Sequence, residues 1–405
     1  MFQGEDLFNC LGGNIFILLF LNPCSVFFKL SHHRLSLRMF LLLITISIVL
    51  GGLLIYVPAL VKVHRLRTGT LAWTLVRTAP LSWWHHPIAA YLLGSFSLGF
   101  RYLTRDYRCL PDFYILGSQK CGTTALASYL QQHPCILSPY SGVCRKETQF
   151  WTGKTLGPEQ AVATPEGISL YRLFFPLNLT KWFCSTILHR PRMLSFDGTP
   201  AYLFLTFLPR RLAVATPEAR MIVLLREPIS RLVSQFSFNQ HRGGDRFKAM
   251  DQFQNIESML TLELDQENIA LWAGLDNLDL DEPIPRYTES SQSTAALVYN
   301  ASLRRRGQYA EQLSLWFKYF PRDRFLIVNS SLFSSNPAAV LSQVLDFLEL
   351  PQHPFRPLTT AEQNITSTAK KSSVVLSPES QASLEEHFAP HNAALVRLLG
   401  SQFAW

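Results

Sequence analysis

Charged residues are scarce in this sequence, and their scarcity excludes an intrinsically disordered chain. Asp, Glu, Lys and Arg make up 16% of the 405 residues, whereas hydrophobic residues make up 48%, which is enough for a large buried core. Basic residues exceed acidic ones, so the formal net charge is +8 and an anionic partner is expected. No basic run interleaved with aromatic residues accompanies this excess, which argues against a nucleic-acid partner.

Cysteines are also few, seven in all, and they are not spaced as metal ligands. The chain contains neither C-x-x-C nor H-E-x-x-H, so no metal site is predicted. Seven thiols do not form a dense disulfide framework, although they are compatible with an oxidising lumenal compartment. Cys135 and Cys144 are a candidate pair for one small disulfide loop, and Cys121 is expected to be unpaired.

One long run without charges lies near the N-terminus. Residues 39–57 (MFLLLITISIVLGGLLIYV) are uncharged, and the run continues to residue 61, which is the length of a transmembrane helix. We therefore expect a cytosolic segment 1–38, a transmembrane signal-anchor 39–61, an aromatic-rich stem 62–108 and a lumenal domain 109–405. Three alternatives stay open: a shorter apolar run at 15–21 also inserts, translation begins at Met39, or the stem packs on the main domain.

The glycosylation triplets supply the orientation of this anchor. Basic residues flank the run on both sides, so the positive-inside rule does not decide. All four triplets, at Asn178, Asn300, Asn329 and Asn364, lie C-terminal to the run. The sequence therefore predicts a single-pass type II membrane protein with a lumenal main domain.

The clearest chemical signal lies in residues 113–124 (FYILGSQKCGTT). A short apolar run ends in a turn and precedes the helix-like ALASYLQQH, which is typical of a buried parallel strand that leads into a helix. Free N–H groups at the start of that helix attract a phosphate-like anion, and Gly122 lets the backbone approach it. Thr123 stands where a nucleoside-triphosphate loop has its lysine, and Lys120 is instead placed to reach the bridging oxygen of a 5′-phosphate leaving group. By itself the segment is also compatible with an ordinary strand-to-helix turn.

The succession of strand, polar turn and helix recurs along the chain. Further apolar strands are expected within 193–202 and at 220–225 and 325–329, and amphipathic or helix-like segments at 229–239, 303–320 and 384–399. This pattern predicts an α/β fold, a three-layer sandwich around a central, mostly parallel sheet, with the ligand site at the carboxyl ends of the strands. Residues 245–292 are polar and mixed in pattern, and we expect an irregular insertion or an acceptor-binding element there.

Two motifs resemble the cofactor site of the sulfotransferases that use 3′-phosphoadenosine 5′-phosphosulfate (PAPS). The order K-x-G-T-T at 120–124 resembles their P-loop-like 5′-phosphosulfate loop, and R-E-P-x-x-R-x-x-S at 226–234 resembles their 3′-phosphate site. Supporting matches to the Golgi carbohydrate sulfotransferases, particularly the heparan 3-O and N-sulfotransferase type and the N-acetylgalactosamine 4-sulfate 6-O-sulfotransferase, occur at 146–151, 197–202, 307–313 and 395–405. The resemblance covers residues 112–405.

This resemblance implies a role for each matched residue. Glu147 is the implied catalytic base, and Lys120 is implied to stabilise the bridging oxygen of the departing phosphate. Cofactor binding is implied for the loop residues and the 3′-phosphate site, with a basic pair standing loosely for a loop that closes over the cofactor: Ser118, Lys120, Cys121, Gly122, Thr123, Thr124, Arg226, Ser234, Lys370 and Lys371. Lys146, Asp197 and Thr199 are candidate acceptor contacts.

The sequence departs from the family pattern where the acceptor binds. Gln149 stands where many relatives have histidine, and Gly198 where the 3-O type has lysine, so acceptor contacts do not carry over. The expected activity is sulfonate transfer from PAPS, without a metal, to a sugar hydroxyl of a glycosaminoglycan of chondroitin, dermatan or heparan type in the Golgi lumen. Two rival classes stay open. A P-loop nucleotide kinase would have a similar anion-binding loop, although this sequence lacks the Walker lysine of such a kinase. A catalytically silent glycan-binding membrane protein would keep the fold and the basic charge.

Overall fold

The computed structural model describes residues 98–140, 146–187, 189, 192–242, 255–263, 276, 278–284, 302–359, 374 and 376–405. The chain divides into two units, residues 1–58 and 59–405, and all of the described residues lie in the second. The predicted span 39–61, most of the predicted stem and Cys144 lie outside these residues. Within them, no helix combines the length and the apolar character that crossing a membrane requires.

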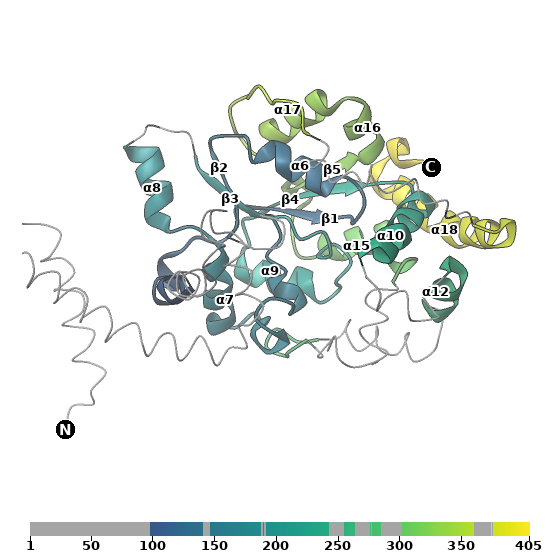
Figure 1. Cartoon of the computed structure of the whole chain (residues 1–405), viewed down its shortest axis with the longest axis horizontal. Coiled ribbons are helices and arrows are strands. Elements are labelled where there is room, and N and C mark those ends of the chain that lie inside the picture. Colours follow the sequence, from purple (N-terminus) through teal and green to yellow (C-terminus); the bar gives the residue numbers. More distant parts are fainter. Residues whose placement is uncertain are drawn as a thin grey trace, which may run out of the picture. The chain divides into compact units, whose positions relative to one another are not determined.

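Five parallel strands form the centre of the fold (Figure 1). In the order in which they lie side by side, they are β2 (Ile136–Leu137), β3 (Leu194–Asp197), β1 (Phe113–Gly117), β4 (Arg220–Leu225) and β5 (Phe325–Asn329). Short or near-continuously apolar strands of this kind are typical of a parallel sheet that is covered on both faces. The strands within 193–202 and at 220–225 and 325–329 are therefore confirmed, whereas the two-residue β2 gave no signal in the sequence.

Strand β1 is the central strand, and the chain reverses its direction of travel across the sheet beside it. β1 pairs with β3 on one side and with β4 on the other. After β3 the chain passes over β1 to form β4, and then β5. In open α/β sheets ligands bind at such a switch point, outside the carboxyl ends of the strands.

Helices cover both faces of the sheet, and alternate side chains of β1 separate the two cores. Phe113 and Ile115 pack in one hydrophobic cluster with residues of α6 (Thr123–Leu130), α16 (Ser330–Ser335) and α17 (Pro337–Phe347). Tyr114 and Leu116 pack in the other with residues of α7 (Pro165–Tyr171), α9 (Leu208–Ala215) and α15 (Tyr309–Trp316). The expected three layers are present, and every strand pairing within the sheet is parallel.

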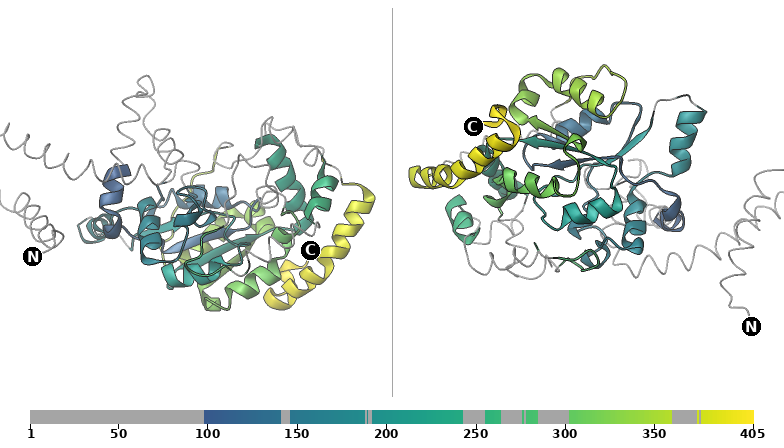
Figure 2. Two further views of the ribbon diagram at one scale, coloured as in Figure 1. Left: turned by 90° about the horizontal axis from the view of Figure 1, so that it is seen from below. Right: turned by 180° about the vertical axis from the view of Figure 1, so that it is seen from behind.

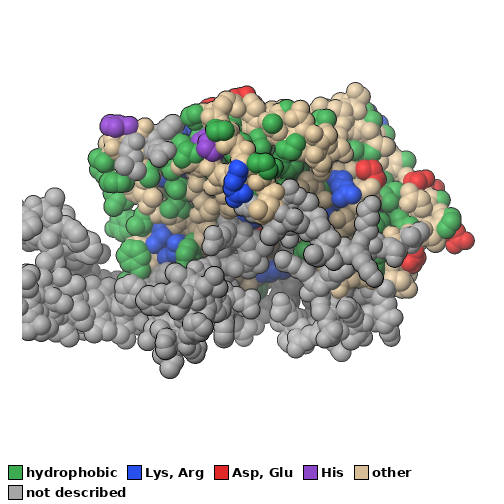
Figure 3. Space-filling model, turned by 45° about the horizontal axis from the view of Figure 1, so that its top comes forward, with side chains coloured by type: hydrophobic (Ala, Val, Ile, Leu, Met, Phe, Trp, Pro, Cys, Tyr) green, Lys and Arg blue, Asp and Glu red, His purple; other side chains and the backbone are tan. Residues whose placement is uncertain are grey.

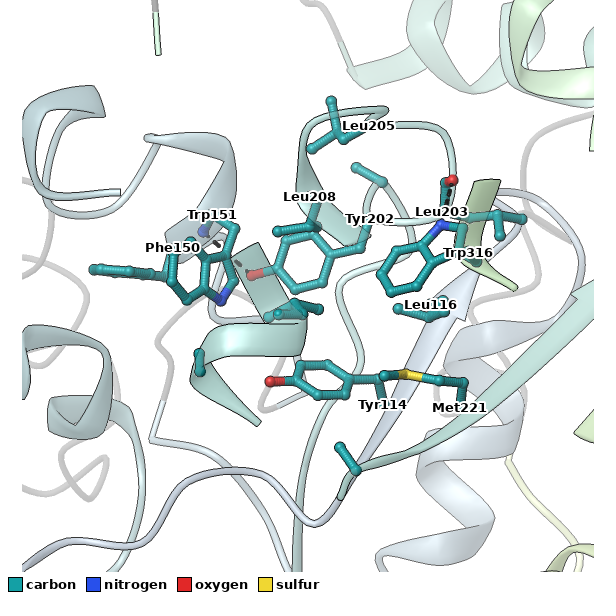
Figure 4. Close-up of a cluster of buried hydrophobic side chains, with 14 of the residues drawn as sticks. Tyr114, Leu116, Phe150, Trp151, Tyr202, Leu203, Leu205, Leu208, Met221 and Trp316 are labelled. Carbon is teal, nitrogen blue, oxygen red and sulfur yellow. Dashed lines mark hydrogen bonds between the residues drawn. The ribbon is translucent and has the colours of Figure 1, made fainter. Parts of the chain in front are cut away.

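The second of these clusters anchors the chain that follows β3 (Figure 4). Trp316 donates from Nε1 to the carbonyl of Leu203 over 3.0 Å, and the backbone N–H of Trp151 donates to the Tyr202 hydroxyl over 3.4 Å. Leu98 and Tyr102, from the end of the predicted stem, are buried in the same cluster. The folded core therefore includes chain that precedes residue 109.

A third cluster lies beyond the carboxyl ends of the strands (Figures 1 and 2). It joins α10 (Pro228–Arg242), α12 (Ile256–Glu263) and α18 (Pro378–Leu399). The predicted helix at 303–320 is shorter than expected, because residues 305–307 form a 3₁₀ turn before α15 begins. A Cβ on Gly307 would lie 2.8 Å from the Phe388 ring of α18, so glycine is needed for the 3₁₀ turn to approach α18 so closely.

The helix α8 (Asn178–Thr186) lies near the amino-terminal ends of the strands (Figure 1). The 3₁₀ turns complete the elements: Arg105–Tyr107, Phe150–Thr152, Pro158–Gln160, Arg172–Phe174, Arg305–Gly307, Arg322–Arg324 and Ser401–Phe403. No pattern in the sequence predicted α7, α8 or α9, because tertiary contacts rather than a long amphipathic period stabilise these short helices.

Candidate active site

Three candidate segments lie at the carboxyl ends of three neighbouring strands. The segment with Glu147 is tied to the residue after β3 by a 2.7 Å hydrogen bond from the Gly198 N–H to the Lys146 carbonyl. The loop with Lys120 follows β1, and Arg226 follows β4. Because β3, β1 and β4 are adjacent in the sheet, the outer two are separated by two strand spacings, about 10 Å. The fold therefore brings together groups that are more than a hundred residues apart in sequence.

The loop after β1 presents its backbone at the start of α6. Gly122 is exposed, has a φ of 93° and stands at the N-cap, so it occupies the left-handed region in which a side chain would be strained. Lys120 also has a positive φ, 72°, and its Nζ lies 4.2 Å from the centre of the Phe238 ring on α10. The first turn of α6 directs unpaired N–H groups at the space above the loop, which suits an anion.

The segment after β4 lies against this loop. The Ser118 N–H donates to the Leu224 carbonyl over 2.7 Å, and Arg226 follows Leu224 by two residues. The Tyr309 hydroxyl of α15 donates to the Arg226 carbonyl over 2.9 Å and fixes the strand end. The side chains of Arg226 and Ser234 are both half-buried. A doubly charged phosphate ester fits a half-buried guanidinium and hydroxyl of this kind.

A fully buried arginine lies behind the same loop. Arg231 donates from Nη2 to the Leu303 carbonyl, whereas its Nε and Nη1 have no hydrogen-bond partner. This guanidinium adds positive potential beneath the anion loop, where Cys121 is also fully buried. Burial raises the pKa of the Cys121 thiol to about 11, although Arg231 and Arg226 oppose the rise. Cys121 is a free thiol and stays neutral beside the site.

Glu147 is held by a neighbour on each side. Lys146 Nζ donates to Oε1 over 2.5 Å and to the Gly198 carbonyl over 3.0 Å, and Gln149 Nε2 donates to Oε2 over 2.5 Å. The Gln149 amide is oriented in turn by Thr152, whose hydroxyl donates to its Oε1 over 3.2 Å. Only 15% of the Glu147 side chain is exposed. A carboxylate oxygen can accept more than one hydrogen bond, so both oxygens of Glu147 can still accept one from a substrate hydroxyl.

Asp197 fastens the Glu147 segment to the sheet. Its carboxylate is fully buried at the end of β3 and accepts six hydrogen bonds, three on each oxygen. The donors are the Thr148 N–H and hydroxyl, the Thr199 N–H and hydroxyl, and the hydroxyls of Tyr171 and Tyr202. Burial raises the pKa of the Asp197 carboxyl, and the bonds from Thr148, Thr199 and Tyr171 oppose the rise because they stabilise the charged form. Asp197 and Thr199, candidate acceptor contacts, thus have their side chains turned into the protein.

Some contacts around the site had no signal in the sequence. Arg306 is buried, stacks 3.9 Å from the Phe204 ring centre and donates to the Gln119 side chain in the anion loop. Gln149 appeared only as a departure from the family pattern, and its contact with Glu147 depends on a left-handed backbone, φ 55°. The positive φ is unusual for glutamine, and no periodicity would have shown it.

The glycosylation triplets differ in their surroundings. Asn178 is exposed at the start of α8. Asn329 caps α16 through its side-chain oxygen and donates from Nδ2 to the Gln402 carbonyl over 3.0 Å, so a glycan on that nitrogen would have to replace the hydrogen that this bond does not use. Asn300 and Asn364 lie outside the described residues, as do Lys370 and Lys371.

The fold and site define an α/β protein whose parallel sheet carries an anion-binding loop, a basic strand end and a held carboxylate along one edge. Among the described residues no three His, Cys, Asp or Glu side chains are grouped to hold a metal ion. Residues 110–389 match the family model described as the sulfotransferase domain. The chain belongs to this family, which confirms the resemblance that the motifs gave.

Several curated proteins are similar to this chain. Carbohydrate sulfotransferase 15 of Mus musculus is 27% identical over 74% of this chain and 55% of its own length. Bifunctional heparan sulfate N-deacetylase/N-sulfotransferase 4 of Mus musculus is 28% identical over 62% of this chain and 24% of its own. The membrane-associated sulfotransferase kil1 of Dictyostelium discoideum is 24% identical over 73% of this chain and 67% of its own. The first two alignments therefore span about half and about a quarter of those proteins.

We expect Asp197→Asn to loosen the Glu147 segment without disturbing the anion loop. The NH₂ group of the asparagine cannot accept hydrogen bonds from the donors that surround one oxygen of Asp197. Leaving these donors without an acceptor costs about 1–3 kcal/mol of folding free energy. Thermal unfolding should shift to lower temperature, and hydrogen exchange should accelerate in residues 146–152 but not in residues 118–126.

Tyr171→Phe is the matched control, because it removes one of the six donors and leaves the carboxylate in place. Its effect on exchange should be in the same direction and smaller. Unchanged exchange in residues 146–152 of the Asp197→Asn protein would show that other contacts hold the segment.

We expect Cys121 to resist alkylation in the folded protein. With its pKa at about 11, the thiolate fraction at pH 8 is about one in a thousand, and burial further hinders the reagent. Iodoacetamide labelling followed by peptide mass spectrometry should modify the half-exposed Cys184 at least about a hundredfold faster. Equal rates for the two cysteines would contradict the burial of Cys121.

Proposed function

We propose that this protein transfers a sulfonate group from PAPS to a hydroxyl of a carbohydrate. The observation that carries the proposal is the order of groups along the carboxyl edge of the sheet: Glu147 by β3, the Lys120 loop after β1 and Arg226 after β4. One adenosine nucleotide with phosphates at its 3′ and 5′ positions is long enough to reach from β4 to β1. Its sulfonate would then point toward β3.

The donor fits the residues present. The start of α6, exposed Gly122 and Lys120 would hold the 5′-phosphosulfate, with Thr123 and Thr124 in the first turn. Arg226 and Ser234 would hold the 3′-phosphate, which is the group that distinguishes this donor from ATP. Two nitrogens of the buried Arg231, Nε and Nη1, have no hydrogen-bond partner, which supports an anionic occupant near them. When bound, PAPS supplies an activated sulfonate and a phosphate leaving group.

Glu147 takes the proton from the acceptor hydroxyl at a free acceptor position of its carboxylate. Lys146 and Gln149 hold the two oxygens in place, so the base does not have to be oriented during the reaction. Lys120 neutralises the charge that develops on the bridging oxygen of the departing phosphate. Alignment and charge stabilisation are what transfer of such a group requires.

The acceptor is a glycosaminoglycan of chondroitin, dermatan or heparan type in this proposal. The names of two similar proteins refer to carbohydrate and to heparan sulfate, and the net charge of +8 favours an anionic polymer. The span at 39–61 anchors the protein in the Golgi membrane as a type II protein with its sheet in the lumen. The similar kil1 protein, described as membrane-associated, supports a membrane location.

We predict that Glu147→Gln abolishes transfer and leaves donor binding intact. The amide cannot accept the proton, so turnover should fall by about a hundredfold or more. The assay uses radiolabelled PAPS with desulfated and natural chondroitin, dermatan and heparan chains in the presence of EDTA, followed by disaccharide analysis. Binding of 3′-phosphoadenosine 5′-phosphate, measured by calorimetry, should stay within about threefold of wild type.

Glu166→Gln, on the exposed first turn of α7, is the matched control and should retain full turnover. Wild-type turnover in Glu147→Gln would remove Glu147 from the role of base. Loss of turnover in EDTA would favour a metal-dependent kinase instead.

A second prediction concerns the 3′-phosphate. Arg226→Ala should weaken binding of 3′-phosphoadenosine 5′-phosphate by about tenfold or more, because a charge-assisted hydrogen bond is worth about 2 kcal/mol. Binding of adenosine 5′-phosphosulfate, which lacks the 3′-phosphate, should be unchanged. If both nucleotides lose affinity equally, Arg226 does not read the 3′-phosphate.

A further inference from the structure

The helix α8 has its apolar side chains on the outside. Leu179, Trp182, Phe183 and Ile187 are between 47% and 64% exposed, and no residue of α8 is buried. At 100° per residue these four fall within one arc of the helix and its final turn. We refer to them as the apolar face of α8.

The opposite side of α8 faces the protein and is the more polar one. Lys181 forms an ion pair with Asp112, the residue before β1, and Cys184 is half-buried against the core on that face of the sheet. A surface helix of a soluble domain normally has the reverse arrangement, with its apolar stripe turned to the core. The inverted pattern indicates that the apolar face of α8 has a partner outside this fold.

More exposed apolar residues lie beside this helix. The isolated bridge between Arg108 and Leu177 places the turn that ends at Tyr107 next to the start of α8. Seven of the eleven large exposed hydrophobic residues in the described part of the chain lie within residues 98–107 and 178–187: Phe100, Leu103, Tyr107, Leu179, Trp182, Phe183 and Ile187. In Figure 3 hydrophobic side chains gather over the end of the domain where Figure 1 has α8. Clustering on this scale marks an interaction site rather than scattered surface residues.

This surface lies away from the candidate active site. Asp112 precedes β1, whereas the anion loop follows it, so the pair between Lys181 and Asp112 holds α8 at the amino edge of the sheet. Figure 1 shows α8 at the amino-terminal ends of the strands and α10 beyond their carboxyl-terminal ends. Whatever covers the apolar face of α8 therefore leaves the catalytic edge free.

We propose that the apolar face of α8 docks on a lipid bilayer and rests the catalytic domain on the membrane surface. Tryptophan, phenylalanine and leucine on one side of a short helix are the residues that enter the headgroup boundary. The helix, NLTKWFCST, has no acidic residue that a bilayer would repel. Tyr107, 72% exposed beside the helix, is suited to the same boundary.

The place where the chain enters the described domain favours the same partner. The helical residues 98–103, which carry Phe100 and Leu103, come just before the turn that lies next to the start of α8, and the uncharged run ends at residue 61. The chain between them, fully extended, spans at most about 130 Å. Tethering at such a distance gives a high effective concentration, so a few apolar side chains suffice for docking. The catalytic edge would then face away from the bilayer, toward polymeric acceptors.

The test measures whether lipid reaches Trp182. The full chain is reconstituted in phosphatidylcholine nanodiscs, with either plain or brominated acyl chains, and the difference in fluorescence between wild type and Trp182→Phe gives the emission of Trp182. We expect brominated lipid to reduce this emission by at least about twofold, because an interfacial helix buries its apolar face about 5–10 Å deep. The same difference for Trp405→Phe, a tryptophan outside this surface, should not change.

Two results would overturn the proposal. If aqueous acrylamide quenches Trp182 and brominated lipid does not, the apolar face of α8 is exposed to water rather than to lipid. If neither quencher reaches Trp182, the apolar face of α8 is covered by another protein, by a second copy of the chain or by a glycan on Asn178. Both substitutions keep an aromatic ring, and thermal unfolding checks that the variants are folded.

Discussion

The buried carboxylate of Asp197 is the interaction on which the candidate site depends. Six donors from four residues converge on it at the end of β3, and none of them is a cation. A charge without a counter-ion is tolerated in an interior only when its hydrogen-bonding capacity is filled. That requirement holds Thr148 and Thr199 at one carboxylate, and it therefore restricts the position of Glu147, the residue before Thr148. The base of the proposed reaction is thus positioned by a residue that is itself fully buried.

The groups proposed for the donor and for the acceptor lie on different strands of the sheet. β1 and β4 carry the groups proposed for the donor, and β3 carries the segment proposed for the acceptor, so the reacting groups would meet above β1. Tyr309 and Arg306, from the motif around α15, brace the two donor segments by contacts to Arg226 and Gln119. Positive charge beneath the loop is reinforced by Arg231, whose buried N–H groups are not all used. Rigid elements thus supply the alignment that transfer of a highly charged group needs.

The two edges of the sheet have different surroundings. The carboxyl edge collects polar and charged groups that are half-buried, whereas the amino edge carries the exposed apolar face of α8 and the turn beside it. The two ends of the strands in a parallel sheet can carry different functions, because the loops at each end vary without changing the strands. If the amino edge rests on a membrane, the sheet itself orients the candidate active site away from that membrane.

The sequence by itself determined the class of fold, the family and the anion loop. Apolar runs such as 220–225 and the glycine spacing at 117–122 are local properties, and local patterns are visible without a structure. The six-donor contact at Asp197, the clamp of Gln149 on Glu147 and the link of Arg306 to Gln119 join segments about 50 to 190 residues apart or require a left-handed backbone. The inversion of α8 is of the same kind, since a helical period gives the faces of a helix but not which one meets the core. Only tertiary structure decides such contacts, because they depend on how the strands are ordered in the sheet rather than on neighbours in the chain.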